Sequence, residues 1–273
     1  MSYDTYNNDT KTIITPVGLT VAPTVTVAAQ PTSVEPTKNI GKETPADKRQ
    51  NPINYYVKFS FMITYILLLT TATLTFIEAM RTKIPSVRHI LNLETCISVV
   101  AGYFYSVFLA QIQDYEKQDK PVDWADISRT RYVDWSITTP LMLITLCVVL
   151  SVESKKSVNL HTILQIIGLN YIMLFIGFMG EMGNLTKWTA CLTGFIPFTV
   201  MFYLVYTRFV KGHTSFSNSF LYYFYLIIWS LYGVVYMLPD NIKNIAMNVL
   251  DCIAKCLIGN GLFIYYSGII KGW

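Results

Sequence analysis

Seven apolar stretches, separated by short polar gaps, occupy most of this chain after its first fifty or so residues. Each is long enough to cross a hydrocarbon core of about 30 Å as a helix, which takes about 20 residues. Charged residues make up 14% of the 273 positions, whereas soluble domains carry about 25%. We therefore expect an all-α membrane protein, a bundle of seven transmembrane helices, with spans at 54–79, 87–111, 130–150, 158–180, 188–210, 216–238 and 245–270.

The first 52 residues differ from the rest of the chain. They begin MSYDTYNNDT, are rich in Thr and Pro, and show no helical period. Such a segment cannot bury enough apolar surface to fold by itself. We expect residues 1–52 to be a disordered or extended polar tail, and residues 53–273 to form the membrane domain.

The short loops between the spans differ in charge. RTKIPSVR, ESKK and TRFVKGH are basic, whereas DYEKQDKPVDWAD is acidic. Basic loops stay in the cytoplasm, which puts these three loops and Lys271 inside and the acidic loop outside. Seven spans then leave the N-terminus extracellular and the C-terminus cytoplasmic.

Several classes of function find little support in the sequence. The net charge of +4 is spread over several loops without a basic stripe, so we expect no nucleic-acid binding. The five cysteines and three histidines show no metal-binding spacing, so we predict no metal site. Seven helices alone fit receptors, transporters and photoreceptors equally, so the ionisable residues within the spans have to decide.

The last span carries a lysine near its middle. The segment NVLDCIAKCLIGNGLFIYY places Asp251 and Lys255 four residues apart, on one helical face. Charges at mid-bilayer depth cost about 2.5–3.5 kcal/mol each on the mildest scale, so each needs a partner or a function. Two interpretations stay open at this point. The residues form a neutralising ion pair, or the Lys255 amine is kept in apolar surroundings to condense with an aldehyde.

The third span, RYVDWSITTPLMLITLCVVL, places Arg131, Asp134 and Thr138 on one face near its outer end. Pro140 interrupts the backbone bonding there, and we expect the hydroxyl groups of Thr138 or Thr139 to compensate. A lysine in the seventh span would then face carboxylates on two helices, and Arg131 would bring the cluster close to neutrality.

Three segments together carry a family resemblance: RYVDWSITTPL in the third span, WSLYGVVY in the sixth and DCIAK in the seventh. With them, the chain after residue 53 resembles the microbial (type I) rhodopsins. The resemblance implies all-trans retinal bound to Lys255 as a protonated Schiff base, with Asp134 and Asp251 as counterions and Asp134 as the primary proton acceptor. It also implies a role in gating the outer half for Arg131, and a chromophore pocket formed by Trp135, Thr138, Thr139, Gly180, Trp229, Tyr232 and Tyr236.

The proton donor of the best-known pumps has no counterpart here. The position eleven residues after Asp134 holds Thr145, which cannot donate a proton at neutral pH. Two other acids lie toward the cytoplasmic side, Glu78 near the end of the first span and Glu94 within the second. We expect Glu78 to be the better donor, because an apolar surround keeps it protonated. Salt-bridge or capping roles for both acids stay open.

The set of Glu78, Arg88 and Glu94, the missing donor and the abundant Lys, Asn and Tyr resemble the rhodopsins of giant algal or protist viruses. That group contains both proton pumps and cation channels. We first expect a light-driven outward proton pump. A light-gated cation channel is the alternative, favoured by five polar residues within the spans: Asn92, Glu94, Asn170, Asn248 and Asn260.

Two further interpretations complete the set. A sensory photoreceptor ranks third, and a colourless receptor or transporter with a structural Asp251–Lys255 ion pair ranks last. The family resemblance also implies a homo-oligomer, a trimer or pentamer, that carries protons or small cations across a lipid bilayer. None of these interpretations makes the protein an enzyme.

Overall fold

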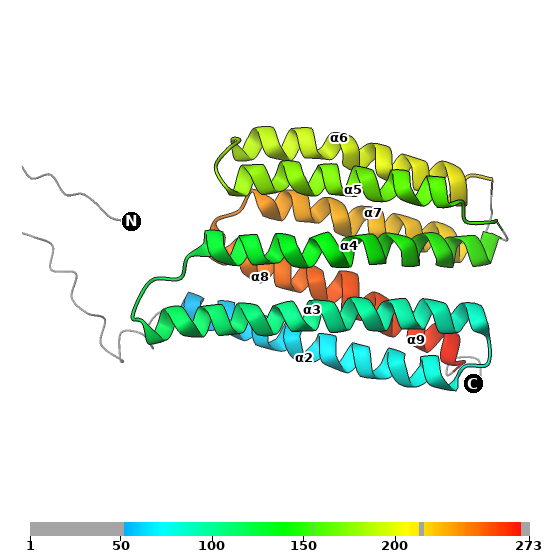
Figure 1. Ribbon diagram of the computed structural model, residues 1–273, viewed down its shortest axis with the longest axis horizontal. Coiled ribbons are helices and arrows are strands. Elements are labelled where there is room, and N and C mark those ends of the chain that lie inside the picture. The colour runs from blue at the N-terminus through cyan, green and yellow to red at the C-terminus, as the bar shows by residue number, and fades with distance from the viewer. Residues whose placement is uncertain (1–51, 155, 213–215, 269–273) are drawn as a thin grey trace, which may run out of the picture. The chain divides into compact units, whose positions relative to one another are not determined.

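The computed structural model describes residues 52–154, 156–212 and 216–268. The predicted tail, apart from Pro52, and Lys271 lie outside these ranges. Within them every regular element is a helix (Figure 1). Seven spans in this part of the chain are long and apolar enough to cross a membrane. The predicted all-α, seven-helix class is confirmed.

The first six spans are formed by α2 (Pro52–Arg81), α3 (Pro85–Lys117), α4 (Trp124–Ser154), α5 (Leu160–Glu181), α6 (Lys187–Val205) with the π-helical turn η1 (Tyr206–Val210), and α7 (Phe216–Tyr236). The seventh span consists of α8 (Asp240–Asp251), the π-helical turn η2 (Cys252–Leu257) and α9 (Ile258–Ser267). Neighbouring spans lie side by side and alternate in direction (Figure 1). Lys255 lies within η2, where the helix departs from regular α geometry.

The third span begins six residues earlier than the predicted start at 130, at Trp124. The reason is an N-terminal helix cap, a feature that a hydropathy pattern does not predict. The Asp123 carboxylate accepts the backbone N–H of Ala125 at 2.9 Å, and this bond satisfies one of the free donors of the first helical turn. The helix therefore continues beyond the apolar segment into the polar residues that precede it.

Pro140 lies inside α4 and has no N–H to donate to the Ser136 carbonyl. The hydroxyl group of Tyr171 on α5 donates to this carbonyl at 3.1 Å. Thr138 and Thr139 instead donate to the carbonyls of Asp134 and Trp135, at 2.9 and 2.6 Å. The predicted compensation by these threonines is therefore wrong for Ser136, because a neighbouring helix supplies the donor.

The bundle is apolar outside and carries its charges inside. On α6, Trp188, Leu192 and Ile196 are 68%, 66% and 65% exposed and form one outward-facing stripe. The buried residues of the described chain, by contrast, include seven acidic or basic side chains, namely Glu78, Glu94, Arg131, Asp134, Lys243, Asp251 and Lys255. This distribution is typical of a protein whose surroundings are lipid and whose function depends on its interior.

Candidate functional site

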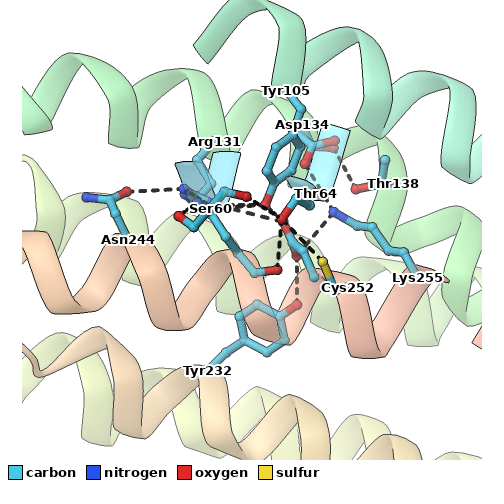
Figure 2. A network of polar contacts seen from close by, with 12 residues as sticks. Ser60, Thr64, Tyr105, Arg131, Asp134, Thr138, Tyr232, Asn244, Cys252 and Lys255 are labelled. Atoms are coloured by element: carbon cyan, nitrogen blue, oxygen red, sulfur yellow. Dashed lines mark hydrogen bonds and ion pairs between the residues drawn. The ribbon is translucent and has the colours of Figure 1, made fainter. Parts of the chain in front are cut away.

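The Lys255 amine lies between two carboxylates from different helices (Figure 2). Its Nζ is 3.2 Å from Asp134 Oδ2 on α4 and 3.2 Å from Asp251 Oδ1 one turn earlier on its own span. All three side chains are almost completely buried. The structure thus brings Asp134, Asp251 and Lys255 together, as the sequence predicted. Asp134 provides a second carboxylate beside the ion pair that Asp251 and Lys255 form within their own span.

Asp251 is fixed by several donors besides Lys255. The hydroxyl groups of Tyr105 and Tyr232 donate to its two oxygens, each at 2.7 Å. Arg131 Nη1 lies 3.7 Å from Asp251 Oδ2. Hydrogen bonds to an ionised carboxylate and nearby cations both stabilise its charged form. Asp251 is therefore a well-compensated anion with little freedom to move.

Asp134 is much less constrained. Its Oδ2 accepts from Lys255, but its Oδ1 has no hydrogen-bond partner within the described ranges. Thr138, which the sequence placed beside it, bonds the Asp134 backbone carbonyl through its hydroxyl group. A buried carboxylate with an unsatisfied oxygen is poorly compensated. The charge of Asp134 is thus less well compensated than that of Asp251.

Arg131 closes the site on the side of the loop between α3 and α4. Its Nη2 donates to Asn244 Oδ1 at 3.1 Å and to Asn248 Oδ1 at 3.0 Å. Its guanidinium carbon lies 5.3 and 5.1 Å from the ring centroids of Phe61 and Phe108, an arrangement typical of a cation–π contact. The arginine is therefore held from several helices.

Sequence analysis did not identify Tyr105 or Asn244 as members of this network. Tyr105 is one of 19 tyrosines in the chain, and no local spacing distinguishes it from those that face lipid. It reaches Asp251 across 146 positions of sequence. Asn244 and Asn248 lie beside Arg131 only because α8 packs near α4 in the folded bundle.

A cavity of about 130 Å³ extends from Lys255 between α4, α5, α6 and α7. This is on the order of ten times the space that one buried water needs. Its wall includes five of the predicted pocket residues, Trp135, Thr139, Trp229, Tyr232 and Tyr236. The rings of Trp135 and Tyr232 meet edge to face, with centroids 5.6 Å apart. The cavity is therefore walled mainly by apolar and aromatic side chains and reaches Lys255.

Two predicted pocket residues, Thr138 and Gly180, are not among the residues that line this cavity. Gly180 lies against the Tyr236 hydroxyl group and the Ala190 side chain, which a Cβ atom at position 180 would overlap. Its small size permits helix packing behind the pocket. The glycines that do line the cavity are Gly177, Gly194 and Gly233.

The two candidate donors lie apart from the Lys255 network and differ from each other. Glu94 on α3 is 1% exposed, and its Oε1 finds no partner among the described side chains and backbone groups. Glu78 near the end of α2 is 7% exposed and lies 3.8 Å from Arg81 Nη1. Glu78 therefore has a cation beside it, and Glu94 forms no ion pair within the described chain.

A second buried ion pair joins α5 to α8 and was not predicted. Lys243 Nζ lies 3.0 and 2.9 Å from the two oxygens of Glu181 and 2.9 Å from Asp240 Oδ1. Lys243 is 3% exposed. It lies at the start of the last span, where the predicted boundary of 245 had left it in a loop.

Comparisons with known proteins show the family and the fold of the chain. A model of the family described as bacteriorhodopsin-like protein matches residues 56–269. Bacteriorhodopsin of Halobacterium salinarum is 26% identical over 225 residues, which cover 72% of this chain and 78% of that protein. The crystal structure of the viral rhodopsin OLPVRII is 40% identical with a TM-score of 0.71, over 78% of this chain and 98% of that one. A proton-pumping rhodopsin of Acetabularia acetabulum, 22% identical with a TM-score of 0.62 over 79% and 96%, shares the fold.

Proposed function

The chain belongs to the bacteriorhodopsin-like family of microbial rhodopsins, which are light-activated membrane proteins and not enzymes, and we propose that it is a light-driven outward proton pump. The observation that carries the proposal is the unequal environment of the two carboxylates beside Lys255. A pump needs one acceptor that takes a proton readily and one anion that keeps its charge, and Asp134 and Asp251 differ in this way.

We propose that the cavity holds all-trans retinal attached to Lys255 Nζ, which the family implies. When bound, retinal supplies light absorption and an isomerisation that turns the proton-bearing nitrogen of Lys255. The aromatic wall and the unsatisfied Asp134 Oδ1 at the lysine end fit this group. Trp135 and Tyr232 restrict the space on two sides.

Asp134 takes the proton from the Lys255 nitrogen in this proposal. Both carboxylates are 3.2 Å from that nitrogen, so distance does not decide between them. Asp251 keeps its charge because two tyrosine hydroxyl groups and Arg131 stabilise the anion. Asp134 loses fewer stabilising interactions than Asp251 when it is protonated. Within the described ranges, its carboxylate bonds only the Lys255 side chain.

The outward direction follows from the position of Arg131 and from the loop charges. Arg131 precedes Asp134 on α4, toward the acidic loop that we place outside. With Asn244 and Asn248 it forms the next polar layer beyond the acceptor. A proton on Asp134 therefore has polar groups ahead of it on this side. The tail at residues 1–51 would also be extracellular.

We propose Glu94, in preference to the predicted Glu78, as the acid that returns a proton to Lys255. Burying an ionised carboxylate without a cation is costly, so the Glu94 site accepts a neutral carboxylic acid. Glu78 has the Arg81 guanidinium 3.8 Å away, a cation of the kind that the described residues do not supply to Glu94. The backbone of Gly259, four residues after Lys255, lies directly beside the Glu94 carboxyl group.

The polar residues that favoured a channel do not support one continuous path. Asn170 donates to Thr139 at 2.8 Å, and Asn248 accepts from Arg131. Asn92 is exposed on the outer surface of α3. Asn170 and Asn248 thus serve separate hydrogen bonds in the described bundle and Asn92 lies outside its interior, which supports the pump over the channel.

Illumination of cells that express the protein with retinal tests the proposal. We expect a coloured protein and acidification of a lightly buffered medium, abolished by a protonophore and absent in the Lys255→Ala variant. Under voltage clamp, the photocurrent should keep its outward sign at zero driving force. A photocurrent that reverses with voltage, with no acidification, would replace the pump by the channel.

A further inference from the structure

Glu94 is part of a buried polar cluster on the side of Lys255 away from Arg131. We define the Glu94 cluster as Thr71 and Thr75 of α2, Glu94 and Ser98 of α3, and Asn260 of α9. Asn260 Nδ2 donates to Thr71 Oγ1 at 3.1 Å. The cluster surrounds Gly259, where a Cβ atom would lie 2.7 Å from Thr71 Cγ2 and 3.2 Å from Glu94 Oε2. The α2, α3 and α9 helices therefore meet closely here.

Ser98 differs from the hydroxyl residues around it. Thr71, Thr75 and Thr95 each donate to the carbonyl one turn before, at 2.9, 2.9 and 2.8 Å. Serine and threonine within helices usually satisfy their hydroxyl groups in this way. Ser98 is completely buried, yet its Oγ has no hydrogen-bond partner within the described ranges. Its hydroxyl group is therefore available for another interaction.

The position of Ser98 lies between Glu94 and the depth of Lys255. Helix α3 packs against η2 and α9 and runs in the opposite direction to them (Figure 1). Four residues of helix span about 6 Å. Ser98 lies that far from Glu94 along α3, and Lys255 lies four residues from Gly259 in the same direction, within the π-helical turn η2. Since the Glu94 carboxyl group lies beside Gly259, Ser98 lies one turn farther along α3, in the direction of Lys255.

We propose that Ser98 relays the proton from Glu94 to the Lys255 nitrogen, through a buried water shared by Ser98 Oγ and Glu94 Oε1. Both atoms are buried and unsatisfied within the described chain, and buried polar groups of this kind are commonly bridged by water. This inference rests on the proposed donor role of Glu94. It assigns the route, which the proposed function leaves open.

The transfer conserves every atom of the relay. Glu94 gives its proton to the water, and the water passes one of its own to the Ser98 oxygen. The Ser98 hydroxyl group releases its original proton to the Lys255 nitrogen. Water and serine end in their starting protonation states, Glu94 ends as a carboxylate, and a cytoplasmic proton later restores it.

Flash spectroscopy on the retinal-bound protein tests the relay by the rate at which the Lys255 nitrogen regains its proton. We expect Ser98→Ala to slow this step about tenfold, the effect of one lost hydrogen bond in the transition state. Ser98→Thr, which keeps a hydroxyl group, should restore most of the rate. The matched control is Ser106→Ala on the same helix, because Ser106 Oγ already bonds the Tyr103 carbonyl. It should behave as the wild type.

A double-variant cycle separates the relay from the donor. Glu94→Gln should slow the step by on the order of 100-fold, and adding Ser98→Ala should then change little. If Ser98→Ala has no effect while Glu94→Gln slows the step, the relay is overturned and the donor stands. If the two effects multiply, Ser98 acts independently of Glu94 and the relay is also overturned. If neither variant slows the step, both the donor and the relay fall, while the acidification assay still decides about the pump.

Infrared spectroscopy measures the hydrogen bonding of the Glu94 carboxyl group, which a change in packing alone would leave unaltered. The carbonyl stretch of Glu94, identified by its loss in Glu94→Gln, should shift to higher frequency in Ser98→Ala, because the carboxyl group loses a hydrogen-bonded partner. Ser98→Thr should return it. An unshifted band in Ser98→Ala, in a variant that still forms the coloured protein, would contradict the shared water.

Discussion

Asp134 and Asp251 each place one carboxylate oxygen 3.2 Å from Lys255 Nζ, but they differ in what holds them. Asp251 accepts hydrogen bonds from Tyr105 and Tyr232, whereas Asp134 Oδ1 is unsatisfied within the described chain. Equal distance with unequal compensation makes the two carboxylates functionally distinct. The predictions below follow from this difference and from the other buried polar groups.

Replacing either carboxylate by asparagine should separate activity from stability. Asp134→Asn should abolish light-driven acidification while the protein keeps its colour, because the acceptor is lost and few contacts change. Asp251→Asn should lower stability by about 3–5 kcal/mol, since Arg131 and Lys255 lose a buried partner. Thermal bleaching of the coloured protein measures the second effect. Equal melting temperatures for the two variants would contradict the assignment.

Tyr105→Phe removes one hydroxyl group without creating a large cavity. That group donates to Asp251 at 2.7 Å and lies 3.0 Å from Asn248 Oδ1. We expect a loss of about 1–3 kcal/mol in stability, because buried polar atoms lose their partner. Tyr103→Phe on the same helix is the control. Tyr103 is 64% exposed, so its change should stay within about 0.5 kcal/mol. Similar losses in both variants would show that the hydroxyl network is not the cause.

Gly259→Ala should disturb the proposed donor. The added Cβ would lie 2.7 Å from Thr71 Cγ2 and 3.2 Å from Glu94 Oε2, so α9 must move or Glu94 must shift. Overpacking of this kind costs about 1–3 kcal/mol. Flash spectroscopy should show slower reprotonation of Lys255. Gly261→Ala, with no atom within 4 Å of its new Cβ, should leave the rate unchanged, and a slowing there would point to a general helix effect.

Glu94→Gln and Glu78→Gln compare the two donor candidates directly. Glu94→Gln should slow reprotonation by on the order of 100-fold, as expected for loss of a positioned proton-transfer acid. Glu78→Gln should have a much smaller effect, because Glu78 lies beside Arg81 at the end of its span. The rate at which Lys255 regains its proton, measured for both variants under identical conditions, shows which acid is the donor. The reverse order would restore the donor role predicted from sequence.

The ion pair of Lys243 and Glu181 should contribute to stability and leave the colour unchanged. Lys243→Met leaves Glu181 buried without its cation, which costs about 3–5 kcal/mol. Adding Glu181→Gln removes the uncompensated charge and should recover much of this loss. Asp240, which also contacts Lys243, is half exposed and keeps water as a partner. Thermal unfolding of the single and double variants measures the recovery, and a double variant as unstable as Lys243→Met would contradict it.

Local sequence patterns determined the spans and the central residues. A membrane selects apolar helices of about 20 residues, so hydropathy alone located all seven spans of the described chain. A charge within such a span is rare enough to identify Lys255, Asp251 and Asp134 without knowledge of the packing. The spacing of Asp251 and Lys255 also fixed them on one helical face.

Tertiary structure decided how these residues are compensated. Tyr105 and Asn244 meet the site from separate helices, and no local sequence pattern marks either of them as part of it. The same holds for the acids: Glu78 and Glu94 both lie in apolar segments, but packing against Gly259 buries Glu94 away from any cation that the described residues supply, while Glu78 lies beside Arg81. Hydropathy depends on one helix at a time, whereas burial and hydrogen bonding of a side chain depend on which other helices surround it.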